Sequence, residues 1–118
     1  KIKTCIYDLE ISLSDLNFKF LKIIEQMGPF GPNNLKPIFC TRNCKSTSQT
    51  RAVGNKNKHL QVYIKSKNKT LKGIAFGRGD ILNKINESKE FDILYSIEKN
   101  TWNGNTELQL VIMDIKFK

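Results

Sequence analysis

Residues 91–117, FDILYSIEKNTWNGNTELQLVIMDIKF, carry two runs of alternating apolar side chains on either side of Asn103-Gly104. An Asn-Gly pair between alternating apolar runs is the strongest short-range signal for a two-residue β-hairpin turn. With this turn Ile97 lies opposite Leu110, so apolar residues of the two strands meet on one face. The stretch therefore predicts two long antiparallel strands of one sheet.

Three further strand-like runs precede this hairpin, at residues 38–45, 59–65 and 70–77. Residues 46–58, after the first run, are polar and are expected to form a loop, and Asp80 is a possible cap for a short helix. Five strands, a long loop after the first and a short helix between the third and fourth follow the order of an OB-fold barrel. We therefore predict a mainly β chain built on a five-stranded OB-fold barrel.

The chain before these strands has a different pattern. An extended N-terminal strand is expected from Ile6 to Ser12, followed by an amphipathic helix from the N-cap Ser14 to Met27. Residues 28–37 hold three prolines and two glycines, which no regular element tolerates. We predict a linker strand, helix and connector over residues 1–34 and an OB domain over residues 35–118.

The positive charge is concentrated in one part of the sequence. The chain has 20 basic and 11 acidic residues and a net charge of +9. Residues 26–79 contain 11 of the basic residues and no acidic residue. A surface of one sign attracts polyanions, which makes nucleic acid the first partner to consider. A lysine-rich composition that only keeps the chain in solution is the alternative.

OB domains bind ligands across strands 2 and 3, with the loops between strands 1 and 2 and between strands 4 and 5. Binding of single strands combines cations with aromatic faces that stack on bases. Tyr63, His59 and Trp102 are candidates for base contact. Their structural alternatives are a solvent-facing tyrosine, a hydrogen bond to a loop and a cross-strand pair, whereas Phe39 and Phe76 are expected in the core. The predicted phosphate contacts are Arg42, Lys45, Arg51, Lys58, Lys65, Lys72 and Arg78.

The cysteines, Cys5, Cys40 and Cys44, indicate neither a disulfide framework nor a zinc site, because they form no Cys-x-x-Cys pair and the chain has one histidine. Their odd number, without a signal peptide, favours a reducing compartment. No apolar run is long enough for a membrane-spanning helix. Because the chain begins at Lys1, we expect it to be part of a longer protein.

Several motifs together resemble the C-terminal part of the RecJ family of single-strand-specific 5′ to 3′ DNA exonucleases. They cover nearly the whole chain, and their order and spacing carry the resemblance. One departure is Asn33, where the family has glycine before the residue equivalent to Asn34. The motifs are Ile11-Ser-Leu-Ser-Asp-Leu-Asn17, Pro29-Phe-Gly-Pro-Asn-Asn-x-x-Pro-Ile-Phe39, Gly54-x-x-x-x-His-Leu60, Ile74-Ala-Phe-Gly77, Phe91-Asp-Ile-x-Tyr-x-Ile97 and Asn100-x-Trp-Asn-Gly-x-x-x-Leu-Gln-Leu110.

The resemblance implies an OB domain that binds single-stranded DNA for the catalytic domains of the same parent chain, in the bacterial cytoplasm. The family holds divalent metal through Asp and His clusters, which this sequence lacks, so we expect a non-catalytic segment without cofactor and Mn or Mg in the parent. A different class of function is a docking domain that recruits the exonuclease to an acidic partner such as a single-strand binding protein. An independent metal-dependent enzyme is disfavoured by the missing ligands, and no membrane partner is expected.

Overall fold

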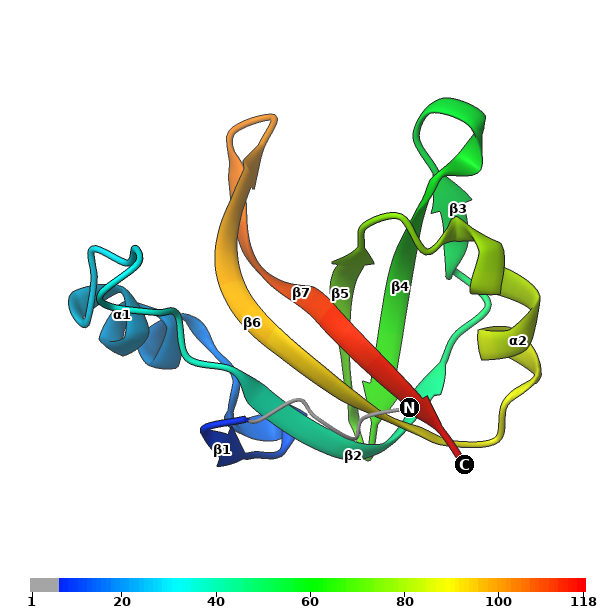
Figure 1. Cartoon of the computed structure of the whole chain (residues 1–118), viewed down its shortest axis with the longest axis horizontal. Helices are drawn as coiled ribbons and strands as arrows, with labels where there is room; N and C mark the ends of the chain where they lie inside the picture. The colour runs from blue at the N-terminus through cyan, green and yellow to red at the C-terminus, as the bar shows by residue number, and fades with distance from the viewer. Residues whose placement is uncertain (1–6) are drawn as a thin grey trace.

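The computed structural model describes residues 7–118 and is mainly β, with one seven-stranded mixed sheet (Figure 1). The strand order is β1-β2-β6-β7-β5-β4-β3. The strands are β1 (Leu9–Glu10), β2 (Phe39–Ser46), β3 (Arg51–Val53), β4 (His59–Ser66), β5 (Lys69–Ala75), β6 (Phe91–Trp102) and β7 (Asn105–Phe117). The helical elements are η1 (Leu13–Asp15), α1 (Phe18–Gln26), η2 (Asn55–Asn57), η3 (Gly79–Ile81) and α2 (Leu82–Glu87).

Five of the strands are joined in a ring of pairings. β2 pairs with β6, β6 with β7, β7 with β5 and β5 with β4. β4 also pairs with β2, through Lys45 opposite Lys65 and Ser46 opposite Ile64. Only the β5–β7 pair within the ring is parallel. Each of these five strands therefore has a paired neighbour on both sides, while β1 and β3 extend the described sheet.

The register predicted for the last hairpin is confirmed. Ile97 lies opposite Leu110, and the turn residues Asn103 and Gly104 have φ angles of 50° and 79°. Positive φ at both central residues is the conformation that a twisted two-residue hairpin requires. Pairing continues to Trp102 opposite Asn105, so both strands extend up to the two turn residues.

The sheet has seven strands, the five of the ring together with β1 and β3. β3 lies within the segment that was expected to be a polar loop, where Gly54, with a φ of 85°, turns the chain so that Ala52 pairs with Leu60. β1 lies within the strand predicted from Ile6 to Ser12 and pairs in parallel with the start of β2, through Leu9 opposite Phe39. β3 has three residues, which are too few for the alternation on which the strand prediction rested.

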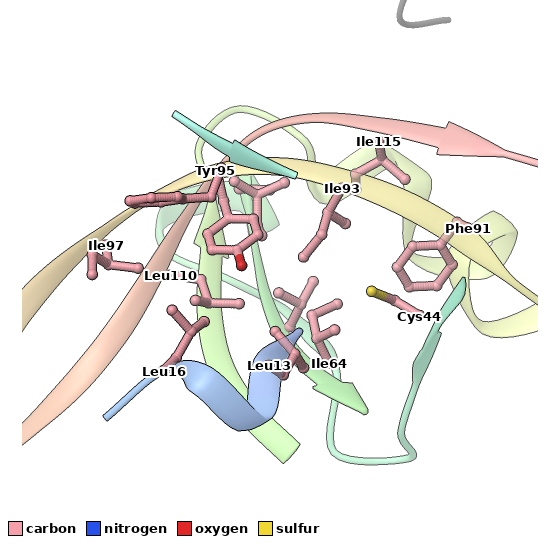
Figure 2. Close-up of a cluster of buried hydrophobic side chains, with 14 of the residues drawn as sticks. Leu13, Leu16, Cys44, Ile64, Phe91, Ile93, Tyr95, Ile97, Leu110 and Ile115 are labelled. Carbon is pink, nitrogen blue, oxygen red and sulfur yellow. The ribbon is translucent and has the colours of Figure 1, made fainter. Parts of the chain in front are cut away.

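The N-terminal segment differs from its prediction in where its helix begins. Asn17, not Ser14, caps α1, because its side-chain oxygen accepts a hydrogen bond of 2.8 Å from the Phe20 N–H. The preceding η1 turn buries Leu13 and Leu16 completely. Both point into the central hydrophobic cluster in Figure 2. Ile6 and Cys5 lie outside the described residues, and the division at residues 34 and 35 stays a prediction.

The connector forms its turn without a glycine at Asn33, whose φ is not positive. Gly31 and Asn34 exchange two backbone hydrogen bonds of 2.9 and 3.0 Å. The Asn34 amide also donates to the carbonyls of Met27 and Pro29, at 2.9 Å each. The side chain of Asn34 therefore fixes the connector against the end of α1.

The core fills the inside of the ring. The Tyr95 hydroxyl, fully buried, hydrogen-bonds the Thr41 hydroxyl at 2.7 Å. A Cβ on Gly73 would lie 3.0 Å from that of Leu110, so glycine allows β5 and β7 to approach closely. Phe39 is buried, as predicted.

The prediction for Phe76 is wrong, because this residue is 63% exposed. The small residues Gly73 and Ala75 of β5 face the core. Alternation then places Ile74 and Phe76 on the outside of the ring. The side of β5 that carries the larger apolar residues Ile74 and Phe76 therefore faces outward, although the sequence analysis expected Phe76 in the core.

Candidate nucleic-acid interface

Alternate residues of β4 form an outward-facing polar row. The residues between them, Leu60, Val62 and Ile64, are fully buried, so the side chains of the others point away from the core. Cross-strand neighbours extend the row, with Arg51 opposite Gln61, Lys72 opposite Tyr63 and Lys45 opposite Lys65. We call this surface the β4 face, and it consists of Lys45, Arg51, His59, Gln61, Tyr63, Lys65 and Lys72.

Lys45 and Lys65 lie directly opposite each other where β2 meets β4, and both are exposed. Within residues 7–118 neither ammonium group forms an ion pair. Like charges directly opposite across two strands are destabilising. With Lys67 they line a hollow of about 700 Å³ between β2, β4 and the N-terminal segment. An anion bound between the two lysines would relieve their repulsion.

Arg42 lines the same hollow, but its guanidinium is already engaged. Nε lies 2.9 Å from a carboxylate oxygen of Glu10, and Nη1 lies 3.1 Å from one of Asp92. The Tyr7 hydroxyl accepts a further hydrogen bond of 3.3 Å. The hydrogen bonds to Glu10 and Tyr7 raise the pKa of Arg42. Asp15 and Glu90 also line the hollow, so its wall is mixed in charge.

Two other predicted phosphate contacts also have carboxylate partners. Lys72 lies 3.2 Å from Glu107, and Arg78 lies 3.6 Å from Asp80. The acidic partners come from outside residues 26–79. Although this stretch contains no carboxylate of its own, three of its basic side chains therefore lie beside carboxylates in the folded chain. In the described part of the chain, the predicted cations that form no ion pair are Lys45, Arg51, Lys58 and Lys65.

Lys58 lies on the loop just before β4, and Arg78 lies on the loop that follows β5. The Gly79 N–H donates to the Lys58 carbonyl at 2.9 Å and ties these loops together. A Cβ at Gly79 would lie 1.9 Å from the Asn57 carbonyl oxygen, so only glycine allows this contact. The loops therefore hold both cations beside one end of the β4 face.

His59 makes the loop hydrogen bond that was considered as its structural role. Its Nδ1 accepts from the Gly77 N–H at 2.8 Å, and its ring meets the edge of Phe76 with centroids 5.4 Å apart. Phe76 is an exposed aromatic beside the β4 face that the sequence reasoning missed. The small residues Gly73 and Ala75 were the signal, because their alternation assigns Phe76 to the outer side.

Trp102 lies apart from this cluster. It ends β6 opposite Asn105 and is 69% exposed. The tip of the β6–β7 hairpin and the loop between β3 and β4 project separately toward the same end of the molecule in Figure 1. A base contact by Trp102 therefore remains a prediction. It requires a bound single-stranded DNA long enough to extend beyond the β4 face to the tip of the β6–β7 hairpin.

Asp92 is a buried carboxylate that the sequence did not single out. It accepts hydrogen bonds from the Asn43 N–H at 3.0 Å and from Arg42 at 3.1 Å, and the Lys118 ammonium lies 3.1 Å away. Burial alone raises the pKa of Asp92, but the bonds from Asn43 and Lys118 and the charge of Arg42 outweigh it and lower the pKa below its usual value. The ionised carboxylate thus holds Arg42 in place.

We expect Asp92→Asn to lower the free energy of unfolding by about 1 to 2 kcal/mol at pH 7, because charged hydrogen bonds are lost. A lowered pKa in the folded state stabilises the fold above the usual value of 3.8, and this contribution is lost as the pH falls below it. Urea unfolding from pH 7 to 3 should show the difference from wild type shrinking below that value. Asp80→Asn, at an exposed carboxylate, is the control, and a difference independent of pH would contradict the assignment.

Cys40 and Cys44 are free and buried. Burial raises the pKa of both thiols, that of Cys44 to about 12, which keeps them protonated at neutral pH. Among residues 7–118, no group of three or more His, Cys, Asp or Glu side chains could hold a metal ion. No helix in this part of the chain is long and apolar enough to cross a membrane.

These features define a mainly β domain with OB-like strand order and a basic outer face. The family model for the RecJ OB domain matches residues 7–114, and the chain belongs to this family. The resemblance inferred from the sequence motifs is therefore confirmed.

Two curated relatives are each named single-stranded-DNA-specific exonuclease RecJ. The one from Bacillus subtilis (strain 168) is 24% identical over 107 residues, which are 91% of this chain and 14% of the relative. The one from Salmonella typhimurium is 27% identical over 110 residues, which are 93% of this chain and 19% of the relative. The chain thus spans less than a fifth of the length of either relative.

Solved structures share the fold. RecJ from Thermus thermophilus, in complex with Mn²⁺, matches with a TM-score of 0.57 and 22% identity, over 84% of this chain and 13% of that chain. A putative aspartyl-tRNA synthetase from Leishmania major Friedlin matches with a TM-score of 0.60 and 12% identity, over 98% of this chain and 22% of that one. Identities this low show a common fold and nothing more.

Proposed function

We propose that this chain is the five-stranded OB barrel of a RecJ-like 5′ to 3′ exonuclease and that it binds single-stranded DNA through the β4 face. The ring of pairings among β2, β4, β5, β7 and β6 supports the barrel. The family and the names of the bacterial relatives support the parent activity. The domain would hold the strand for a catalytic core located elsewhere in the parent.

The observation that carries the proposal is the Lys45–Lys65 pair at the edge of a face that also holds Tyr63. Two exposed ammonium groups opposite each other, without carboxylate partners in the described chain, form a position for a phosphate. Phosphate contacts position a strand but read no bases, so we expect little sequence preference.

Catalysis would belong to the parent's other domains. The RecJ structures from Thermus thermophilus are described in complex with Mn²⁺ and with Mg²⁺. The donors of this chain do not fit such an ion, because residues 7–118 gather no set of three suitable side chains. We propose that the parent's metal is held outside this segment, in a protein of the bacterial cytoplasm.

A titration of fluorescent oligo-dT at several salt concentrations tests the proposal. The four cations without ion pairs, at about 0.7 per phosphate contact, predict a slope of log K against log salt near −3. Equal binding of mixed-sequence single strands should accompany this slope. Binding without a salt dependence, or no binding at all, would contradict the proposal.

Recruitment of the parent to an acidic partner, such as a single-strand binding protein, would use the same cations. Competition separates the two functions. If oligo-dT binds and an acidic peptide displaces it only at far higher concentration, DNA binding is supported. Tight binding of the peptide with no binding of oligo-dT would establish the docking function instead.

A further inference from the structure

A separate hollow of about 450 Å³ lies where the start of α1 meets β4, β5 and β7. Its lining includes two aromatic rings, Phe18 from α1 and Tyr63 from β4, with Leu71 and Leu108 as apolar neighbours. Pockets of a few hundred Å³ with mostly apolar walls and a few polar groups are typical of sites for small ligands or parts of ligands. Phe18 is 54% exposed here, although it lies on an element with a buried side.

The position of Phe18 is fixed by the segment that carries it. Leu13 and Leu16, just before it, are completely buried in the core. The Lys69 ammonium donates a hydrogen bond of 2.5 Å to the Leu16 carbonyl. Asn17 caps the first turn of α1. An exposed aromatic ring on a backbone held in this way loses little freedom when it binds a ligand.

The charge around the hollow suits a polyanion. Lys69 and Lys72 line it, and the carboxylate among its lining residues, Glu107, is engaged by Lys72 at 3.2 Å. The hollow is also continuous with the β4 face, because Tyr63 belongs to both. Tyr63 and Lys65 are two residues apart on one strand and therefore roughly 7 Å apart. If a phosphate of the single-stranded DNA contacts Lys65, an adjacent nucleotide of the same DNA therefore reaches this hollow.

We propose that this hollow is a subsite for one nucleobase of the bound single strand, contacted by Phe18 and Tyr63, with Lys69 beside the adjoining phosphate. The inference rests on the proposed function and adds α1 to the binding surface. Stacking on aromatic rings accepts any base, because every base has a π-face. The subsite therefore contributes affinity without sequence preference.

Phe18→Ala tests the subsite. We expect it to weaken binding of oligo-dT by about tenfold, the loss typical of one stacked base, and to leave the salt slope unchanged because no cation is removed. Ile23→Ala is the matched control, since Ile23 is 50% exposed on the same helix and does not line the hollow. Circular dichroism melting should show that both variants remain folded.

A strand of abasic deoxyribose phosphates distinguishes stacking from an indirect effect. Wild type and Phe18→Ala should bind this ligand equally, because it offers no base to stack. Equal affinities of wild type and Phe18→Ala for oligo-dT would overturn the subsite while the proposed function stands. The same loss for both ligands would also overturn it. If wild type binds no single strand, the proposed function fails and the subsite fails with it.

Discussion

Reversal of both charges of the Lys45–Lys65 pair, as Lys45→Glu with Lys65→Glu, is expected to weaken binding of oligo-dT by about a hundredfold. Each charged contact to a phosphate contributes about 1.5 kcal/mol or more, and two are removed. The two carboxylates also repel the strand, so the salt slope should fall by more than the roughly 1.4 expected for two lost phosphate contacts. Fluorescence anisotropy with labelled oligo-dT measures both quantities.

The control for this variant is a second double reversal, Lys22→Glu with Lys36→Glu. Both lysines are exposed, on α1 and on the connector, and the net charge changes by the same amount. Neither lysine belongs to the β4 face or lines the hollow beside Phe18. A small loss is expected there, from long-range repulsion alone. Equal losses in the two variants would show that binding depends on total charge and not on the β4 face.

The second large effect concerns stability. Leu16→Ala is expected to lower the free energy of unfolding by about 3 kcal/mol, because it removes a completely buried side chain and leaves a cavity. Leu35→Ala, at a side chain that is 76% exposed, should change it by less than about 0.5 kcal/mol. Urea unfolding measures both variants.

A loss below about 1 kcal/mol for Leu16→Ala would contradict the packing of the η1 turn against the ring. The result also bears on the nucleobase subsite. Leu16 lies two residues before Phe18 and accepts the hydrogen bond from Lys69. If this anchor were weak, Phe18 would not be held beside Tyr63.

Local patterns in the sequence were sufficient for the long elements. The turn at Asn103-Gly104 fixes the register of β6 and β7, since a slip by one residue would expose Ile97 and Leu110. The alternation of β4 likewise predicted the outward side of His59 and Tyr63. For the β6–β7 hairpin and for β4, the residues that determine the structure lie close together in the sequence.

The contacts that the sequence did not predict join residues distant in the sequence. Arg42 remains a predicted phosphate contact, but Glu10 and Asp92 engage its guanidinium from positions 32 and 50 residues away. The hollow that Phe18 and Tyr63 line brings together residues from α1, β4, β5 and β7, beside Leu16, which packs into the core. The charge of a sequence segment and the periodicity of its apolar residues each describe one segment of the chain. Neither property can therefore predict contacts between distant segments.

The central claim, that a single strand binds across the β4 face, is tested most directly by titrating ¹⁵N-labelled protein with oligo-dT and mapping amide shifts. The account predicts large, salt-sensitive changes at β3, β4 and β5, centred on Tyr63 and Lys65, and at Phe18. The amides of α2 should be almost unchanged. Changes confined to α2 or to the connector, with β4 unaffected, would contradict the claim.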